Sequence, residues 1–530
     1  MSARRLALFV GLSGSVLCNV AAATNITGPW IQAYQPPNGL AVTQAEQTYP
    51  APNKCYPNTR KLLCAQLVQT LSASTIEKAR QLADLSVSAL ANNEVALPDG
   101  SSLIDDYAYP EATNNVELYR VTYRSKDING LATKLSGLVA VPRPLLGNQG
   151  AKDGMVVYMH ATTADVNNAP GDRSEEAYGA ITAFAGNDWL VAMPDYLGYG
   201  VNKKPHPYAM GKFNAQSGID MIRAARELAK KIGVPVGSAI NVTGYSEGGG
   251  NSMWLGRALD EQFNCEGCQK EPDMKPTRIA PMSGPYDLSG ATARSFIDSQ
   301  PAYDAQNIQD KPTLLAFAGI ATAKVSKPKI PVNSLLQDTL ASQAKGLFPG
   351  PYADGDVGAR MLTVAIDQLN YFPSILAGIT YPDRLLQPAL VEAIKTQDFT
   401  NPAMKLWQEN DAVNWSPNVP LYLLGIVQDP IVPFASSTYQ LPVYYTDNLK
   451  GAQAPYASGN SEQVIRAMRN KGKSTSEVSW LGFNGLVKGG LANTTTMTHA
   501  AGFVPCSMLA VQFFRGTPLT SLPSLEDPAN

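Results

Sequence analysis

The stretch Ile240-Asn241-Val242-Thr243-Gly244-Tyr245-Ser246-Glu247-Gly248 decides the fold. Its first residues are β-branched and apolar enough to predict a short strand, and the pattern that follows, from Gly248 to Leu259, predicts a helix. Residues 244–248 match Gly-x-Ser-x-Gly, a sharp strand-to-helix turn that exposes a serine hydroxyl at the helix N-terminus. Because small residues let the two backbones pass closely in such a turn, we interpret Ser246 as a candidate nucleophile.

Apolar strands and helices alternate on both sides of this turn. The expected strands are 155–159, 189–193, 239–243, 278–282, 419–426 and 478–483, and the expected helices are 215–229, 461–470 and 501–514. Two earlier β-rich segments, 116–123 and 136–141, are separated by polar turn residues and predict an antiparallel pair. Fully apolar strands that alternate with helices indicate an α/β fold with a mostly parallel sheet covered on both faces.

One long segment departs from this alternation. Residues 289–417 are mainly helical and interrupt the series of strands. An insertion of this length is more typical of a helical cap than of a loop, and caps cover active sites and control substrate access. The predicted organisation is a core of residues 111–288 and 418–520, a cap at 289–417, and an N-terminal extension at 24–110 that carries a helix at 74–92.

The first residues have the features of an export signal. Arg4-Arg5 gives a positive start, residues 6–16 are apolar but too few to span a bilayer, and Ala21-Ala22-Ala23 offers a cleavage site. We predict a signal peptide at 1–23, which would remove Cys18, rather than a buried helix. No later stretch is long and apolar enough to form a transmembrane anchor, so we expect an exported protein, secreted or periplasmic.

The five remaining cysteines predict disulfides, because exported proteins meet an oxidising environment. Local spacing favours the pairs Cys55–Cys64 and Cys265–Cys268 and leaves Cys506 free, although other pairings remain open from sequence. The Cys265-Glu-Gly-Cys268 spacing also occurs in redox and zinc sites. Here no strand precedes it and no further ligands lie nearby, which favours a structural loop.

A serine nucleophile needs a general base within hydrogen-bond reach. The chain has three histidines, at 160, 206 and 499. In this type of fold the catalytic residues follow the order serine, acid, histidine, and His499 alone comes after Ser246. It also lies between the last predicted strand and the last predicted helix. We therefore predict that His499 is the general base.

The acid of the triad should follow the strand at 419–426, and Asp429 comes directly after it. Its expected role is to fix the imidazole tautomer and to stabilise the imidazolium ion. Asp195 precedes Ser246, so the chain order argues against it. The other candidates, for which turns, helix caps or the solvated surface are the expected roles, are Asp287, Asp411 and Asp447.

Two backbone amides are expected to form the oxyanion hole. The first is the N–H of Glu247, directly after the nucleophile, where an acidic side chain also suits the helix dipole. The second should come from the loop after the strand at 155–159, which reads His160-Ala161-Thr162-Thr163. This loop is similar to the His-Gly-x segment of many esterases, a match that makes the Thr162 N–H the donor. We expect His160 to organise the loop, and His206 to be structural or to line the pocket.

Together these segments resemble the secretory lipase family, the lipase-A-like α/β-hydrolases of fungi and bacteria, over about residues 115–515. The resemblance rests on 136–142, 194–200, 206–208, 244–249, 429–433 and His499. It implies the α/β-hydrolase fold with a helical cap between the sixth and seventh strands, and hydrolysis of carboxylic esters, often acyl glycerols. The chain departs from the family at Ala161, where a glycine is expected, and in its N-terminal extension.

The predicted function is that of a serine carboxylic-ester hydrolase, a lipase or esterase that acts through an acyl-enzyme on a small-molecule or lipid ester and makes transient contact with a lipid interface. The same triad can cleave amides, so a serine peptidase or amidase remains an alternative. It would need a site for a charged peptide terminus, which the sequence does not reveal. A non-catalytic binding protein on this fold is a second alternative, against which an intact Ser, Asp and His argue.

The sequence points to no cofactor, metal or nucleic-acid partner. A net charge of −2 over 530 residues lacks the basic excess of nucleic-acid binders. Lys203 occupies the third glycine position of a dinucleotide motif that would begin at Gly198, and no His-Glu-x-x-His occurs. Acyl-chain preference should depend on the cap. The residues that could line an apolar pocket there, most of them expected in helix cores, are Phe317, Leu362, Tyr371, Phe372 and Trp415.

Overall fold

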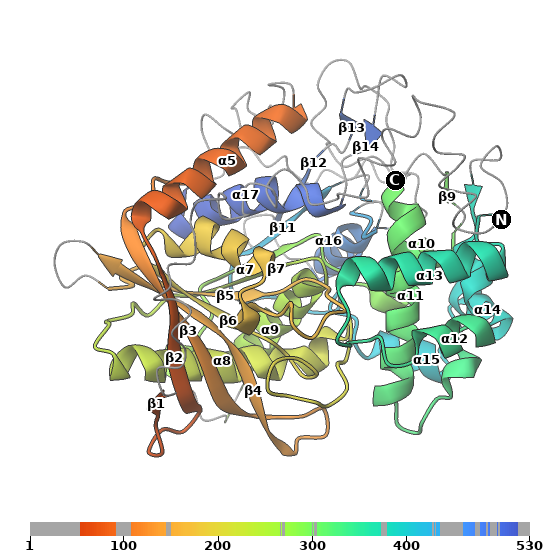
Figure 1. The fold of residues 1–530 in the computed structure, drawn as a ribbon, viewed down its shortest axis with the longest axis horizontal. Helices are drawn as coiled ribbons and strands as arrows, with labels where there is room; N and C mark the ends of the chain where they lie inside the picture. Colours follow the sequence, from red (N-terminus) through yellow and green to blue (C-terminus); the bar gives the residue numbers. More distant parts are fainter. Residues whose placement is uncertain are drawn as a thin grey trace.

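The computed structural model (Figure 1) describes residues 54–91, 108–144, 150–265, 267, 271–298, 300–301, 305–372, 379–426, 429, 431–434, 459–471, 478–483, 486–487, 495–496 and 499–517. The predicted signal peptide, Cys268 and Asp447 lie outside these residues.

Ten strands within the described part of the chain form one mixed sheet in the order β1-β2-β3-β4-β6-β5-β7-β8-β11-β12. The strands are β1 (Lys54–Cys55), β2 (Leu62–Leu71), β3 (Asn114–Lys126), β4 (Ala132–Pro144), β5 (Gly154–Met159), β6 (Trp189–Pro194), β7 (Ile240–Tyr245), β8 (Arg278–Met282), β11 (Leu421–Ile426) and β12 (Val478–Phe483). From β6 to β12 all neighbouring strands are parallel, whereas β2, β3, β4 and β6 pair antiparallel. The predicted strands are all present, and the fold class is confirmed.

Helices cover both faces of the sheet, which explains why its central strands are mostly apolar. Alternate residues of β5 enter different cores: Met155 and Val157 pack with α8 (Gly211–Lys231) and α9 (Glu247–Asn264). Val156 and Tyr158 instead pack on the opposite face. The helices of that face are α5 (Ala73–Ala91), α7 (Glu175–Ala180) and α17 (Phe503–Arg515) (Figure 1). All six residues of β5, β6, β7 and β11 are buried as a result.

The predicted insertion consists of helices packed beside the sheet, at the right of Figure 1. We refer to the chain between β8 and β11 as the helical insertion. Its helices are α10 (Ala293–Ile297), α11 (Ala305–Val325), α12 (Asp338–Ala344), α13 (Asp354–Leu369), α14 (Pro388–Thr396) and α15 (Pro402–Gln408). Two short strands, β9 (Gln300–Pro301) and β10 (Ile379–Thr380), pair within it. The insertion has a hydrophobic cluster of its own, distinct from the two that flank the sheet.

The segment before residue 111 contributes strands to the main sheet, which the sequence analysis did not predict. β2 pairs antiparallel with β3 along most of its length, with register shifts between Leu62 and Cys64 and between Leu67 and Gln69. These irregularities place Leu62, Ala65 and Val68 toward the core, so the period-2 alternation that identifies a strand is lost. α5 agrees with the helix predicted at 74–92.

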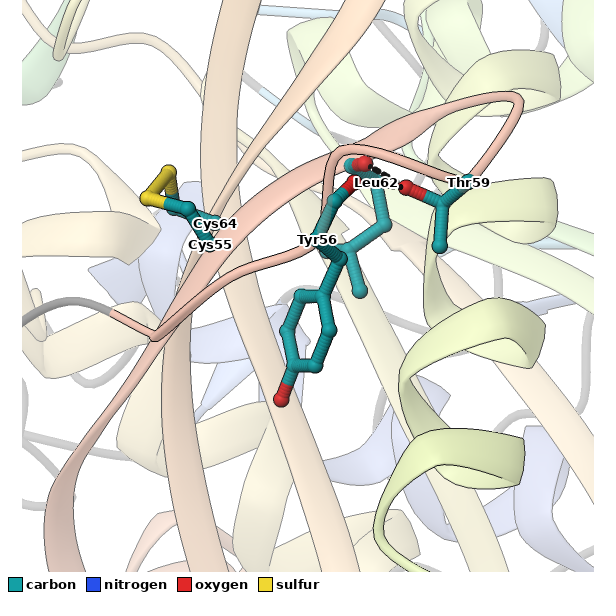
Figure 2. Close-up of a disulfide and its surroundings, with 5 residues drawn as sticks. All are labelled: Cys55, Tyr56, Thr59, Leu62 and Cys64. Atoms are coloured by element: carbon teal, nitrogen blue, oxygen red, sulfur yellow. Dashed lines mark hydrogen bonds between the residues drawn. A yellow bond between two sulfur atoms is a disulfide. The ribbon is translucent and has the colours of Figure 1, made fainter.

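The β1–β2 hairpin is closed by a disulfide between Cys55 and Cys64, which face each other in register (Figure 2). Glu227 of α8 ties the same hairpin to the core, because its carboxylate accepts hydrogen bonds from three consecutive amides at residues 60–62. Cys265 is also disulfide-bonded, and its predicted partner lies outside the described residues. Cys506 is a free thiol buried in α17. No helix in the described part of the chain could cross a membrane.

Candidate active site

Ser246 occupies the turn between β7 and α9 with φ 57° and ψ −123°. A non-glycine residue in this region is strained and persists only where the surrounding structure enforces it. The Ser246 N–H donates to the carbonyl of Met282 on β8, at 3.0 Å. A Cβ on Gly248 would lie 1.9 Å from the carbonyl oxygen of Met159 at the end of β5. The turn thus requires the glycine that the motif supplies, and it presents Ser246 at the carboxyl edge of the sheet.

His499 and Asp429 meet at the same edge. Nδ1 of His499 lies 2.6 Å from Oδ2 of Asp429. The other carboxylate oxygen of Asp429 accepts hydrogen bonds from the amides of Ile431 and Val432, at 2.9 and 2.8 Å, and the side chain is fully buried. Because Nδ1–H donates to this carboxylate, Nε2 is the basic nitrogen of the imidazole.

Tyr245 links the serine turn to the histidine. Its ring centroid lies 5.2 Å from that of His499, and its hydroxyl donates to the backbone carbonyl of His499. Ser246 and His499 both line a cavity of about 480 Å³. The fold therefore brings together three predicted residues that are separated by up to 253 positions in the chain. Ser246 and His499 line the same cavity, and Asp429 is bonded to the other side of the His499 ring.

The cavity extends from this edge into the helical insertion and is mostly apolar. Phe317 is part of the lining, as the sequence analysis allowed. Leu362, Tyr371 and Phe372 pack instead in the insertion's own cluster, and Trp415 packs in the core on the α8–α9 face. The large apolar side chains that line the cavity are Leu288, Phe296, Leu314, Leu315, Phe317, Leu386, Ile394, Trp407, Ile431, Val432 and Phe503.

Both expected oxyanion residues, Glu247 and Thr162, also line the cavity. The Glu247 amide lies at the N-terminus of α9, directly after Ser246. Its carboxylate accepts from Nε2 of His206 at 2.8 Å and from the amide of Ala209 at 3.2 Å. This buried pair gives His206 a structural role behind Glu247. Of the two roles expected from the sequence, His206 has the structural one, since it is not among the residues that line the cavity.

Glu176 of α7 is a residue of the cavity wall that the sequence analysis missed. Its two carboxylate oxygens lie 2.8 and 3.0 Å from the amide nitrogen of Ala161, and the Tyr158 hydroxyl donates to it at 2.6 Å. Burial, with a smaller contribution from the charge of Glu247, raises the pKa of Glu176 to about 7. Nothing in its local sequence distinguishes it from an acidic residue in the first turn of a helix.

The remaining candidates have structural partners. His160 is stacked on Tyr196, with ring centroids 4.0 Å apart, and its Nδ1 lies 2.7 Å from the carbonyl oxygen of Ala161 in the loop. Burial lowers the pKa of His160 to about 4. Asp195 accepts from Ser136 Oγ and the Gly171 amide. Asp287 and Asp411 lie at the two ends of the helical insertion. Asp287 accepts a hydrogen bond from the Ala291 amide, and Asp411 accepts from the amide and hydroxyl of Ser289. Within the described residues, no group of side chains is arranged to hold a metal ion.

Comparisons with known proteins agree with this arrangement. A family model described as secretory lipase matches residues 178–262, a segment that includes Ser246. No curated protein sequence matches the chain. Among solved structures, a protein from Legionella pneumophila is 20% identical with a TM-score of 0.61, and the alignment covers 88% of this chain and 100% of that one. The rice cell wall degrading esterase LipA from Xanthomonas oryzae is 21% identical with a TM-score of 0.62, over 86% and 98% of the two chains.

These structural likenesses confirm the α/β-hydrolase fold expected from the sequence. The family match confirms the resemblance to secretory lipases over residues 178–262. It supports a hydrolase of the lipase and esterase kind, without specifying the catalytic residues.

Proposed function

We propose that this protein is an exported serine carboxylic-ester hydrolase, a lipase or esterase, with Ser246 as nucleophile, His499 as general base and Asp429 as the acid of the triad. The observation that carries the proposal is the hydrogen bond between His499 and Asp429 beside the cavity that Ser246 also lines. The secretory lipase match over the serine turn supports it independently. Export is supported by the disulfide between Cys55 and Cys64.

The proposed reaction is acyl transfer through a covalent intermediate. Ser246 Oγ attacks the ester carbonyl while Nε2 of His499 takes the hydroxyl proton. The amides of Glu247 and Thr162 stabilise the oxyanion of the tetrahedral intermediate. When this intermediate collapses, the alcohol leaves with the proton from His499, and Ser246 holds the acyl group as an ester. Water, activated by the same imidazole, then attacks that ester and releases the carboxylic acid.

The cavity favours an ester with an apolar acyl group. Its wall is built mainly from aliphatic and aromatic side chains, and among the described lining residues there is no Lys or Arg that would attract an anionic acyl chain. We expect the acyl chain to extend from Ser246 into the helical insertion, past Phe317. The insertion would then act as the cap that sets the acceptable chain length.

The peptidase alternative is less well supported, because three of the four acidic side chains of the wall accept hydrogen bonds from the protein itself. The carboxylate of Glu247 accepts from His206, and that of Glu176 accepts from Ala161. Asp354, also in the wall, accepts from Thr163. These three carboxylates are therefore not available as a ready site for a peptide amino terminus.

The test is hydrolysis of p-nitrophenyl esters with acyl chains of two to sixteen carbons, beside p-nitroanilides of the same acids. We expect wild-type protein to cleave the esters and Ser246→Ala to lose activity by roughly 10⁴- to 10⁶-fold. Preferential cleavage of the anilides would favour an amidase. Full ester hydrolysis by Ser246→Ala, or none at any length by wild type, would contradict the proposal.

A further inference from the structure

The loop that carries Thr162 is held from the core side by Glu176. Residues 160–165 follow β5 at the cavity rim. Both carboxylate oxygens of Glu176 accept the single amide proton of Ala161. The carboxylate is itself fixed by Tyr158, a fully buried residue of β5 whose hydroxyl donates to it. Since α7 and β5 pack in the same hydrophobic core, these bonds fix the position of Ala161 relative to the sheet edge.

The same loop is held from the other side by the helical insertion. Asp354, the first residue of α13, accepts hydrogen bonds from the Thr163 hydroxyl at 2.8 Å and from the Ala164 amide at 2.5 Å. The backbone of Gly350 reinforces this contact: its amide donates to the carbonyl of Ala164 at 2.8 Å, and its carbonyl accepts from the Val166 amide at 2.9 Å. The start of α13 and the loop are thus joined by both side-chain and backbone bonds.

Thr162 lies between these two attachments. Its hydroxyl donates to the hydroxyl of Tyr208 at 3.1 Å, and Tyr208 stacks on Phe317 of α11 with ring centroids 4.2 Å apart. No hydrogen bond of the Thr162 amide occurs within the described structure. The amides of Ala161 and Ala164 donate to the two carboxylates. Of the two residues between them, Thr162 lines the cavity and Thr163 does not, so the Thr162 amide is the one placed for a developing oxyanion.

We propose that Glu176 and Asp354 are positioning residues that fix the Thr162 amide in the oxyanion hole, and that Asp354 makes this hole depend on the helical insertion being seated on the core. The inference rests on the proposed function. Neither carboxylate is required to touch the reacting atoms. Each acts through the loop, one from the core and one from the insertion, so that a closed insertion and a complete oxyanion hole occur together.

The test compares Glu176→Ala and Asp354→Ala with two matched controls, Glu175→Ala and Asp356→Ala, which remove exposed acidic residues from the same helices. Loss of one oxyanion donor lowers kcat by about 10²- to 10³-fold, and we expect a partial loss, about 10- to 100-fold, for each positioning variant, with KM changed less than about threefold. The controls should keep wild-type kcat. Glu176→Gln and Asp354→Asn retain an acceptor oxygen and should recover most of it.

The decisive readout is the ratio of kcat for an ester to kcat for the matching thionoester. Sulfur accepts hydrogen bonds from the oxyanion-hole amides weakly, so a displaced Thr162 amide should lower this ratio, whereas general loss of stability would not. Fluorophosphonate titration of the nucleophile gives the active fraction of each variant. If an alanine variant does not fold, Thr163→Val removes one of the bonds to Asp354 at almost constant volume and should lower the ratio in the same direction.

Unchanged ratios in the positioning variants, or equal losses in the controls, would overturn the inference. These outcomes differ from failure of the proposed function, which would appear as wild-type protein that cleaves neither the ester nor the thionoester. A double variant, Glu176→Ala with Asp354→Ala, should lose less than the product of the single losses, because both act on one amide. Fully multiplicative losses would mean that the two carboxylates act on different groups.

Discussion

Asp429 and His499, seventy residues apart in the chain, share a hydrogen bond of 2.6 Å in which the carboxylate is already fixed by two amides of its own loop. The amides of Ile431 and Val432 hold one carboxylate oxygen and direct the other toward Nδ1. The orientation of the imidazole is therefore set by the chain directly after β11, without help from substrate.

Replacing this carboxylate should stop catalysis while leaving the fold intact. We expect Asp429→Asn to lower kcat by ~10⁴-fold, because the amide no longer enforces the tautomer that leaves Nε2 basic. The measurement is kcat on a p-nitrophenyl ester, with Asp367→Asn, an exposed change on α13, as the control. A loss below tenfold in Asp429→Asn would mean that another group orients His499.

The serine turn should not tolerate a methyl group at Gly248. A Cβ there would meet the Met159 carbonyl at 1.9 Å, so Gly248→Ala must displace β5 or α9. We expect a loss of unfolding free energy on the order of 3 kcal/mol, at the upper end for overpacking, together with loss of ester hydrolysis.

The matched control for this change is Gly355→Ala, in the first turn of α13, where an added Cβ has no heavy atom within 4 Å. It should be neutral or stabilising by up to ~1 kcal/mol. Urea unfolding of both variants makes the comparison. Equal stabilities would contradict the close approach of the two backbones at Gly248.

Asp411 should make stability fall as the pH rises. It accepts from the amide and hydroxyl of Ser289 and so joins the two ends of the helical insertion. Burial and the nearby charge of Asp287 raise the pKa of Asp411 to about 7. Between about pH 4 and 7 the folded protein therefore holds a proton on Asp411 that the unfolded chain has lost. The stabilisation that comes from this proton is fully present below about pH 4 and is lost as the pH rises to 7.

The check is urea unfolding from pH 4.5 to 8. One such proton changes the free energy of unfolding by at most about 1.4 kcal/mol per pH unit. In Asp411→Asn, where residue 411 does not titrate, the unfolding free energy should fall less steeply with rising pH over this range. In Asp367→Asn it should fall as steeply as in wild type. The same slope in wild type and Asp411→Asn would show that Asp411 has an ordinary pKa.

Loss of the Cys55–Cys64 disulfide should affect stability and not catalysis. The two cysteines are nine residues apart, and closing a loop of this size stabilises the folded state by about 2 to 3 kcal/mol in the chain-entropy view. The hairpin lies at the β1 edge of the sheet, and none of its residues lines the cavity. Cys55→Ser with Cys64→Ser should lower the unfolding free energy at unchanged kcat. A lower kcat at full folding would mean that the hairpin influences the active site.

The parallel core could be predicted from sequence because its strands are short and mostly apolar, and most of them are followed by a helix. β5, β6 and β7 are buried on both faces, so their sequences contain few polar residues and read as short apolar runs typical of buried strands. β2 could not be predicted, since two register shifts against β3 break its alternation. The bonds that attach Glu227 to the same hairpin join residues more than 160 positions apart and leave no local pattern.

The residues of the candidate site likewise include some that could be predicted from the sequence and some that could not. That Ser246, Asp429 and His499 would lie near one another was predictable, because each follows a strand of the sheet and chain order narrows the choice of residues. Glu176 and Asp354 were not, because each sits in the first turn of a helix, where an acidic residue is ordinary. The role proposed for them depends on contacts with Ala161 and Ala164, which only the folded chain reveals.

The role of Ser246 as nucleophile can be tested by identifying covalently the residue that a fluorophosphonate modifies. Wild-type protein is treated with a fluorophosphonate and analysed by intact mass and by peptide mapping, beside Ser246→Ala and His499→Ala. We expect one phosphonate per chain, located on Ser246, no label in Ser246→Ala, and strongly slowed labelling in His499→Ala. Label on a different residue, or ester hydrolysis that persists in protein whose Ser246 remains unmodified after complete treatment, would contradict this role.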